Sequence, residues 1–464
     1  MERTNLYVSA SIPKLLINAC IPAVVTTLVV TLYNIADVFF VGQTGDPMQI
    51  AAMTLTGPVF AILSGLGTLI GSGGCSAIAM ALGKKNYEQA KSVSSFCCYI
   101  SIALGVVFTL GITIGMPTLL KALGVTPDTQ AHARNYIQIV SLGSPLLLFA
   151  SIFANVVRGE GAVKESMIGN GIGSLVNIIL DPILILGMNM GIVGAAIATV
   201  IGNMVSVLYL VIFIAGKKSQ LSLSIRRFTL RKSVAWRTVA LGFPTALGVA
   251  VMSVSGIVSN HVIGSYGEIA IAASGVSGKL GMIIAMVQIG ICMGIQPALA
   301  YNHGAGNTPR LIRIVKYMAL VTISVGAVLS CAGWFMRSGF LSAFMQNTEV
   351  VAYGEIFIIS GIITGPIIGL CYLATSVLQA TERIKWATGN ALLRQGILLM
   401  PLLLLLNSLI GLTGIVIAHI IVDVVAVTIG LAVCIWQLRL LGKEHEKRSL
   451  GVKIDHTIDT NRSL

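Results

Sequence analysis

The chain has 464 residues, of which 55% are hydrophobic and only 10% are charged, and its mean hydropathy is +0.90. Soluble domains carry roughly 25% charged residues, so this composition excludes a soluble globular protein. A formal net charge of +13 favours nucleic-acid binding in a soluble chain, but here the basic residues follow a membrane topology instead.

Twelve apolar stretches are each long enough to cross a membrane, which takes about 20 residues. In chain order they are residues 13–38, 50–81, 93–116, 133–157, 163–187, 191–214, 236–263, 269–300, 313–336, 351–378, 387–408 and 412–437. The second and eighth stretches are longer than one span needs, and tilting or extension beyond the membrane accommodates the excess. The sequence therefore predicts an all-α membrane protein with twelve transmembrane helices.

The basic residues gather on one side of these spans. When the loops are assigned alternately from a cytoplasmic N-terminus, 25 of the 30 basic residues fall on the cytoplasmic side and three on the outer side. The remaining two, Lys279 and Arg394, fall within spans. Because basic loops stay in the cytoplasm, we expect a multi-pass membrane protein with both termini in the cytoplasm. Its partners are then membrane lipids and not nucleic acid.

The second half of the chain repeats the first at an offset of 220 to 222 residues. For example, Pro145 matches Pro366 and Gly73 matches Gly294. Each half holds six spans, and an even number makes the repeats parallel, related by a pseudo-two-fold axis along the membrane normal. A duplicated chain already supplies both lobes, so we expect a monomer. The predicted domains are an N-lobe (1–215), a basic cytoplasmic linker (216–237), a C-lobe (238–438) and a charged, mobile cytoplasmic tail (439–464).

Two carboxylates in the first half are the main candidates for function. A charge inside a membrane costs about 2.5 to 3.5 kcal/mol on insertion scales. At ~1.5 Å rise per residue, Asp37 and Asp181 both lie roughly 8–9 Å below the outer boundary. Asn34 and Asn177 lie one turn from them, and Thr199 reaches a similar depth. This set of oxygen atoms suits Na⁺, and two close carboxylates suit a proton. The alternative is a structural role, in which the carboxylates bond backbone near the span ends.

The second half breaks this symmetry, because it has no carboxylate at the positions equivalent to Asp37 and Asp181. His419 and Asp423 are four residues apart and share one helix face. They form either a satisfied polar pair or a secondary proton or substrate site. The accessory polar candidates are Asn34, Asn203, Lys279, His419 and Asp423.

No pattern in the sequence indicates an enzyme. The chain has no Walker loop, no HExxH motif and no Cys/His set with the spacing of a zinc site. We therefore expect no catalytic residue, no cofactor and no metal beyond a possible Na⁺ at Asp37, Asn177, Asp181 and Thr199. Transport driven by an ion gradient is then the function class that remains.

Five segments resemble the multidrug and toxic compound extrusion (MATE) family and, within it, the MepA-like bacterial branch. They are residues 33–46, 81–86, 158–161, 177–183 and 191–199. The run Asn-Ile-Ile-Leu-Asp-Pro at residues 177–182 is the most specific of them, and the resemblance extends to about residue 438.

The resemblance implies two six-helix lobes in the bacterial cytoplasmic membrane and export of cationic or amphipathic drugs in exchange for H⁺ or Na⁺ by alternating access. It also implies that Asp37, Asn177, Asp181 and Thr199 form the cation site of the first lobe. The first alternative is a flippase for lipid-linked oligosaccharides or cell-wall precursors of the same superfamily, although only Lys279 and Arg394 supply positive charge within spans. The second is a membrane scaffold or receptor, which needs neither a duplicated bundle nor buried carboxylates.

Overall fold

The computed structural model describes residues 6–216, 218–344 and 348–449, and every regular element among them is a helix. The first half contains α2 (Ile12–Gly42), α3 (Pro47–Leu55), α4 (Gly57–Gly83), α5 (Tyr87–Ala122), α6 (Pro127–Gly159), α7 (Val163–Asp181), η1 (Pro182–Gly187) and α8 (Ile192–Ala215). The rest contains η2 (Ile225–Arg227), α9 (Ala235–Gly264), α10 (Glu268–Gly304), α11 (Thr308–Phe344), α12 (Thr348–Ala380), α13 (Ile384–Leu392), η3 (Leu393–Leu398), α14 (Leu399–Ile410) and α15 (Leu412–Ser449). In the described part of the chain, 12 helical segments are long and apolar enough to cross a membrane, which confirms the predicted all-α membrane fold.

The chain forms two compact units, and two helices are divided between them. The first unit comprises Val25–Gly242, and the second comprises Tyr7–Val24 together with the chain from Phe243 onwards. The first part of α2 therefore belongs to the second unit, and the beginning of α9 belongs to the first. These limits differ from the predicted lobe boundaries, which placed α2 wholly in the N-lobe.

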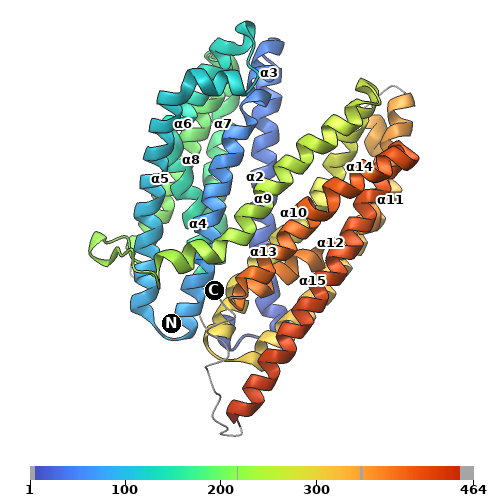
Figure 1. Cartoon of the computed structure of the whole chain (residues 1–464). Helices are drawn as coiled ribbons and strands as arrows, with labels where there is room; N and C mark the ends of the chain where they lie inside the picture. The colour runs from blue at the N-terminus through green and yellow to red at the C-terminus, as the bar shows by residue number, and fades with distance from the viewer. Residues whose placement is uncertain (1–5, 217, 345–347, 450–464) are drawn as a thin grey trace. The chain divides into compact units, whose positions relative to one another are not determined.

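Each unit is built around the fourth span of its repeat. In Figure 1, α6 lies among α4, α5 and α8 in the first unit, and α12 packs against α10, α11 and α15 in the second. The same close approach occurs in both units. A Cβ on Gly105 of α5 would collide with Pro145 of α6, and one on Gly326 of α11 would collide with Gly365 and Pro366 of α12. Small residues permit this packing in a membrane, where contact rather than hydrophobicity drives helix association.

The long second stretch is two helices rather than one. The chain leaves the helix at Thr56, and α4 begins with Gly57 and Pro58. Proline has no amide hydrogen and cannot continue the hydrogen-bond ladder of α3. Its equivalent in α10 at offset 221 is Lys279, and α10 runs unbroken over 37 residues.

The basic linker is tied to the first unit. Ser95 of α5 donates to the carbonyl of Ser222 at 3.0 Å, and Tyr99 donates to that of Leu223 at 3.0 Å. Phe228 stacks on Phe96 with the ring centroids 6.4 Å apart. The linker therefore packs along α5.

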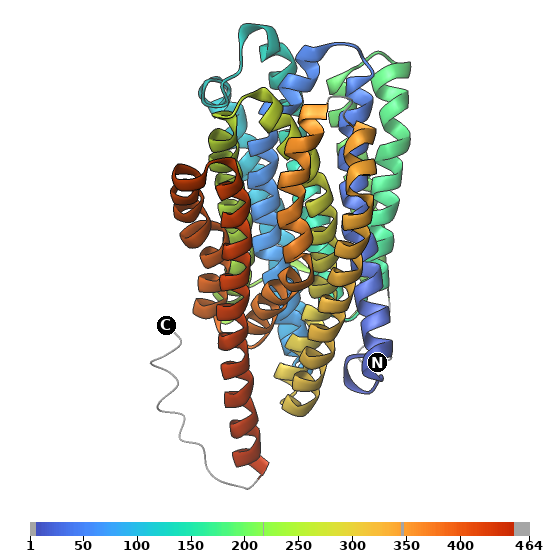
Figure 2. The ribbon, with the colours of Figure 1, turned by 90° about the vertical axis from the view of Figure 1, so that its right-hand side faces the viewer.

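The beginning of the predicted tail is regular structure. Helix α15, the long red helix in Figure 2, continues to Ser449, so residues 439–449 are helical rather than irregular. Leu440 and Leu441 are followed there by a mostly charged run at residues 443–448, which extends the helix beyond its apolar part. The rest of the predicted tail, residues 450–464, lies outside the described residues.

Candidate cation-binding site

The local sequence around Asp181 fixes its position at the end of α7. Asn177 and Asp181 are four residues apart and share one face of the helix. Pro182 then interrupts the α-helical hydrogen bonds, and the chain continues as a π-helical turn, η1. Such turns within helices occur often at functional sites.

Three helices bring the four predicted residues together. Asp37 comes from α2, Asn177 and Asp181 come from α7, and Thr199 comes from α8; their exposed fractions are 4%, 2%, 0% and 4%. The Asn177 amide lies between its neighbours. In one orientation it donates to Asp37 Oδ1 and accepts from the Thr199 amide, each at 3.2 Å; in the other it donates to Asp181 Oδ1 at 3.5 Å. The carboxyl groups of Asp37 and Asp181 therefore both lie within reach of the Asn177 amide.

Two oxygen atoms in this cluster lack a hydrogen-bond partner among the described residues. They are Asp181 Oδ2 and Thr199 Oγ1, and both are fully buried. A buried polar atom without a partner costs about 1–3 kcal/mol, and more when it is charged. The cluster therefore offers unsatisfied oxygen atoms to a proton or a small cation.

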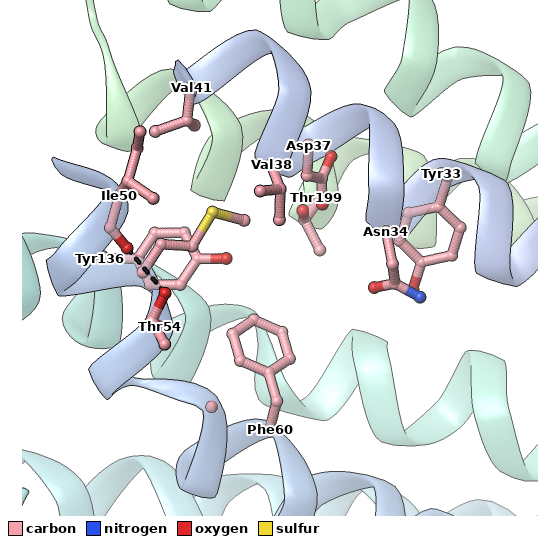
Figure 3. A pocket seen from close by; sticks show the side chains of 12 residues that line it. Tyr33, Asn34, Asp37, Val38, Val41, Ile50, Thr54, Phe60, Tyr136 and Thr199 are labelled. Atoms are coloured by element: carbon pink, nitrogen blue, oxygen red, sulfur yellow. Dashed lines mark hydrogen bonds between the residues drawn. The ribbon is translucent and has the colours of Figure 1, made fainter. Parts of the chain in front are cut away.

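The cluster opens onto a cavity of about 220 Å³ within the first unit. Figure 3 shows Tyr33, Asn34 and Asp37 of α2 on one side and Phe60 and Tyr136 across from them. The walls are mostly apolar and aromatic, and the polar groups gather at the Asp37 end. An aromatic cavity with an acidic end suits an organic cation, because the ring faces and the carboxylate both attract positive charge.

The accessory candidates of the first half differ in position. Asn34 lines the cavity, although its side-chain amide donates to the Val30 carbonyl at 2.7 Å. Asn203 donates to the Thr199 carbonyl at 2.8 Å and so binds to its own helix. Asn34 is therefore available to a ligand at its remaining oxygen, whereas Asn203 supports α8.

The accessory candidates of the second half lie in the second unit. Asp423 pairs with Arg394 through an Nε–Oδ1 contact of 2.7 Å, and Arg394 Nη1 donates to the Tyr372 hydroxyl at 3.2 Å. His419 is half-buried on the same helix as Asp423, and Lys279 lies at an exposed position of α10. The direct partner of Asp423 is thus Arg394, a residue for which the sequence predicted no partner.

The sequence reasoning also missed the walls of the cavity. Tyr33 precedes Asp37 by one helical turn, and this spacing is a signal that could have found it. Met53, Phe60 and Tyr136 come from other helices, and no local pattern distinguishes them from packing residues. Only the packing of α3, α4 and α6 brings them to one surface.

Comparison with known families identifies the family of this chain. A family model described as MatE matches residues 22–183 and again residues 244–405. The chain belongs to the MatE family. The two matches are offset by 222 residues, so the family pattern itself detects the internal repeat. The resemblance predicted from the sequence is confirmed.

Curated relatives agree over almost the whole chain. The chain is 32% identical over 416 residues to "Multidrug export protein MepA" of Staphylococcus saprophyticus, covering 89% of this chain and 92% of the relative. The protein of the same name from Staphylococcus aureus strain MRSA252 is 32% identical over 419 residues, covering 90% and 92%. Relatives of this family are named as transporters, which agrees with a non-enzymatic, multi-pass bacterial membrane protein.

Solved structures show the same fold. "Crystal structure of MATE in complex with MaL6" has a TM-score of 0.90 at 22% identity and covers 96% of this chain and 100% of that chain. "Outward-facing conformation of a multidrug resistance MATE family transporter of the MOP superfamily" has a TM-score of 0.89 at 22% identity and covers 96% and 99%. The overall architecture of the MatE family is therefore shown for this chain.

Proposed function

We propose that this protein exports cationic and amphipathic compounds by alternating access, in exchange for H⁺ or Na⁺. The observation that carries the proposal is the buried cluster of Asp37, Asn177, Asp181 and Thr199 at one end of an aromatic cavity. The relatives named multidrug export protein support the substrate class.

The meeting of Asp37 and Asp181 in one buried cluster favours H⁺ as the coupling ion. Both carboxyl groups lie within reach of the same Asn177 amide, and two bare carboxylates brought together in this way repel each other, which favours the binding of a proton. The oxygen atoms of Asn177 and Thr199 complete a set that also suits Na⁺. Efflux measured under an imposed gradient of each ion in turn distinguishes H⁺ coupling from Na⁺ coupling.

The size of the cavity limits what it holds. Its volume of about 220 Å³ is below the ~300–1,000 Å³ typical of sites for drug-sized ligands. It therefore takes one aromatic or ammonium end of an amphipathic compound. Met53 in its wall adapts to different shapes because its side chain is flexible and polarizable.

Helix α2 is suited to convert the neutralisation of Asp37 into a conformational change. Its outer part carries Asp37 in the first unit, and its beginning belongs to the second unit, with Pro22 near the division. Neutralising Asp37 alters the hold of the first unit on α2, and the proline provides a place where the helix can bend. Drug release on the outer side then follows from repacking of α2. We also propose, from the distribution of the basic residues between the spans, that both termini lie in the cytoplasm.

The flippase alternative is less well supported. A pyrophosphate-linked substrate calls for a positively charged cavity, but Arg394 is paired with Asp423. The cavity of the first unit carries Asp37 and has no basic residue in its lining.

The decisive experiment is ethidium efflux from vesicles under an imposed proton gradient or an imposed Na⁺ gradient. Efflux driven by one gradient in the wild type and lost in Asp181→Asn supports the proposal and names the ion. The matched control is Asp128→Asn, which neutralises an exposed carboxylate outside the cavity and leaves efflux unchanged. Full efflux in Asp181→Asn, with the protein present at wild-type level, would overturn the proposal.

A further inference from the structure

The first unit contains a short helix, α3, that its repeat does not have as a separate element. Residues 47–83 correspond to residues 268–304 at offset 221, and only the first copy is broken, at Thr56 before Gly57 and Pro58. Because Pro58 donates no backbone hydrogen bond, the α-helical hydrogen bonding is interrupted between α3 and α4. The position of α3 then depends on its packing against α6 and on the contacts made by its own side chains.

Helix α3 forms the outer wall of the cavity. Ile50, Met53 and Thr54 line it, together with Val41 at the outer end of α2 (Figure 3). Val41 is fully buried, whereas Ile50 and Thr54 are exposed toward the opening. A displacement of α3 would therefore widen the cavity and expose Val41.

One side chain of α3 fastens it to α8. The N-cap residue of α8 is Gly191, which has no side chain to bond the free amides of the first turn. Gln49 does this from α3: its Oε1 accepts from the Ile192 amide at 2.7 Å. Its Nε2 donates to Asp46 Oδ2 at 3.1 Å, and the same Asp46 oxygen lies 3.6 Å from His132 Nε2 on α6.

Gly191 is the residue that makes room for this contact. Its φ of +54° is in the left-handed region, and a Cβ there would collide with Gln49 Oε1. In the second unit the equivalent turn contains Gly411, with φ +65°, and the neighbouring bond runs from the Tyr266 hydroxyl to Asn407 Oδ1 at 2.7 Å. That bond joins the loop between α9 and α10 to the last turn of α14, and it borders no separate helix comparable to α3.

We propose that Gln49 is a positioning residue of the exporter: by capping α8 from α3, it holds α3 as the outer wall of the cavity and so determines which cations the cavity accepts. The effect on substrates rests on the proposed function, whereas the effect on the position of α3 does not. Loss of this cap lets α3 swing about the Thr56–Pro58 junction. Larger cations then compete better with small ones.

The first test measures the position of α3 without transport. Val41→Cys is introduced together with Cys331→Ser, which removes the exposed native thiol, and the purified protein is labelled with a polar maleimide. Gln49→Leu is expected to raise the labelling rate about fivefold, which corresponds to ~1 kcal/mol for one helix cap. Tyr266→Phe, the matched control in the other unit, is expected to leave the rate unchanged.

The second test measures selectivity in the native-cysteine protein. The ratio of KM for tetraphenylphosphonium to KM for tetraethylammonium is expected to fall about fivefold in Gln49→Leu and to stay unchanged in Tyr266→Phe. Gln49→Glu serves as a second variant, because its carboxylate can still accept from Ile192 but repels Asp46. Gln49→Glu is expected to lower this KM ratio as Gln49→Leu does.

The two tests separate the two proposals. Unchanged labelling in both Gln49 variants, with monodisperse protein, overturns the positioning role. If labelling rises but the wild type exports neither cation, the positioning of α3 stands and the proposed export function fails for these substrates. If labelling rises and both KM values change equally, Gln49 positions α3 but does not determine selectivity, and that part of the proposal is overturned.

Discussion

The ion pair between Arg394 and Asp423 should be strongly coupled, because both side chains are largely withdrawn from solvent. Their exposed fractions are 15% and 10%, and the Nε–Oδ1 distance is 2.7 Å. Removing one partner of a buried pair costs about 3–5 kcal/mol, since the other charge is left without compensation. Replacing both by apolar residues of similar volume often costs little.

A double-mutant cycle tests this expectation. Arg394→Met and Asp423→Leu are each expected to lower the free energy of unfolding by about 3 kcal/mol or more, and the double variant by about 1 kcal/mol. Steric trapping in lipid bicelles measures these values without denaturing the membrane. Tyr372→Phe, which removes only the hydroxyl that accepts from Arg394 Nη1, should cost about 1 kcal/mol.

A surface pair provides the comparison. Lys91 and Glu88 lie 3.2 Å apart on α5, but their side chains are 30% and 71% exposed. Coupling between exposed charges is often too small to measure. If the losses from Arg394→Met and Asp423→Leu simply add in the double variant, the pair is not coupled and the reasoning from burial is wrong.

Three further predictions concern the coupling site, the helix packing and the linker. Thr199→Ala removes a buried oxygen that has no hydrogen-bond partner among the described residues. We expect the ion concentration for half-maximal efflux to rise about tenfold with protein levels unchanged. An unchanged ion dependence would show that Thr199 does not belong to the proposed coupling site. Gly326→Val forces a side chain against α12 and should destabilise the protein by about 2–3 kcal/mol. The control, Gly339→Val on the same helix, meets no atom within 4 Å of its Cβ and should be tolerated. Equal losses of folding stability in the two variants would contradict the packing argument. Glu160→Ala removes the acceptor of the Gln220 amide, so trypsin cleavage of the linker after Lys218 should become about fivefold faster in inside-out vesicles. Cleavage only in right-side-out vesicles would show that the predicted orientation of the chain in the membrane is wrong.

The spans, the duplication and the four residues of the buried polar cluster could be predicted from the sequence because each rests on local or periodic information. Apolar length defines a span, since backbone in the hydrocarbon must form helix. The depth of Asp37 and Asp181 follows from counting residues at a fixed rise per residue. Thr199 was found in the same way, one span later.

Tertiary structure alone decided which side chains meet. The first part of α2 packs with the second unit although hydropathy marks one continuous span. Arg394 and Asp423 lie on different helices, and Gln49 caps a helix that begins 143 residues later. No pattern along the chain encodes such pairs, because they depend on the distances and rotations between helices after packing. Hydropathy predicted which segments enter the membrane. Packing determined which residues form the cavity and its wall in the first unit and the buried ion pair in the second.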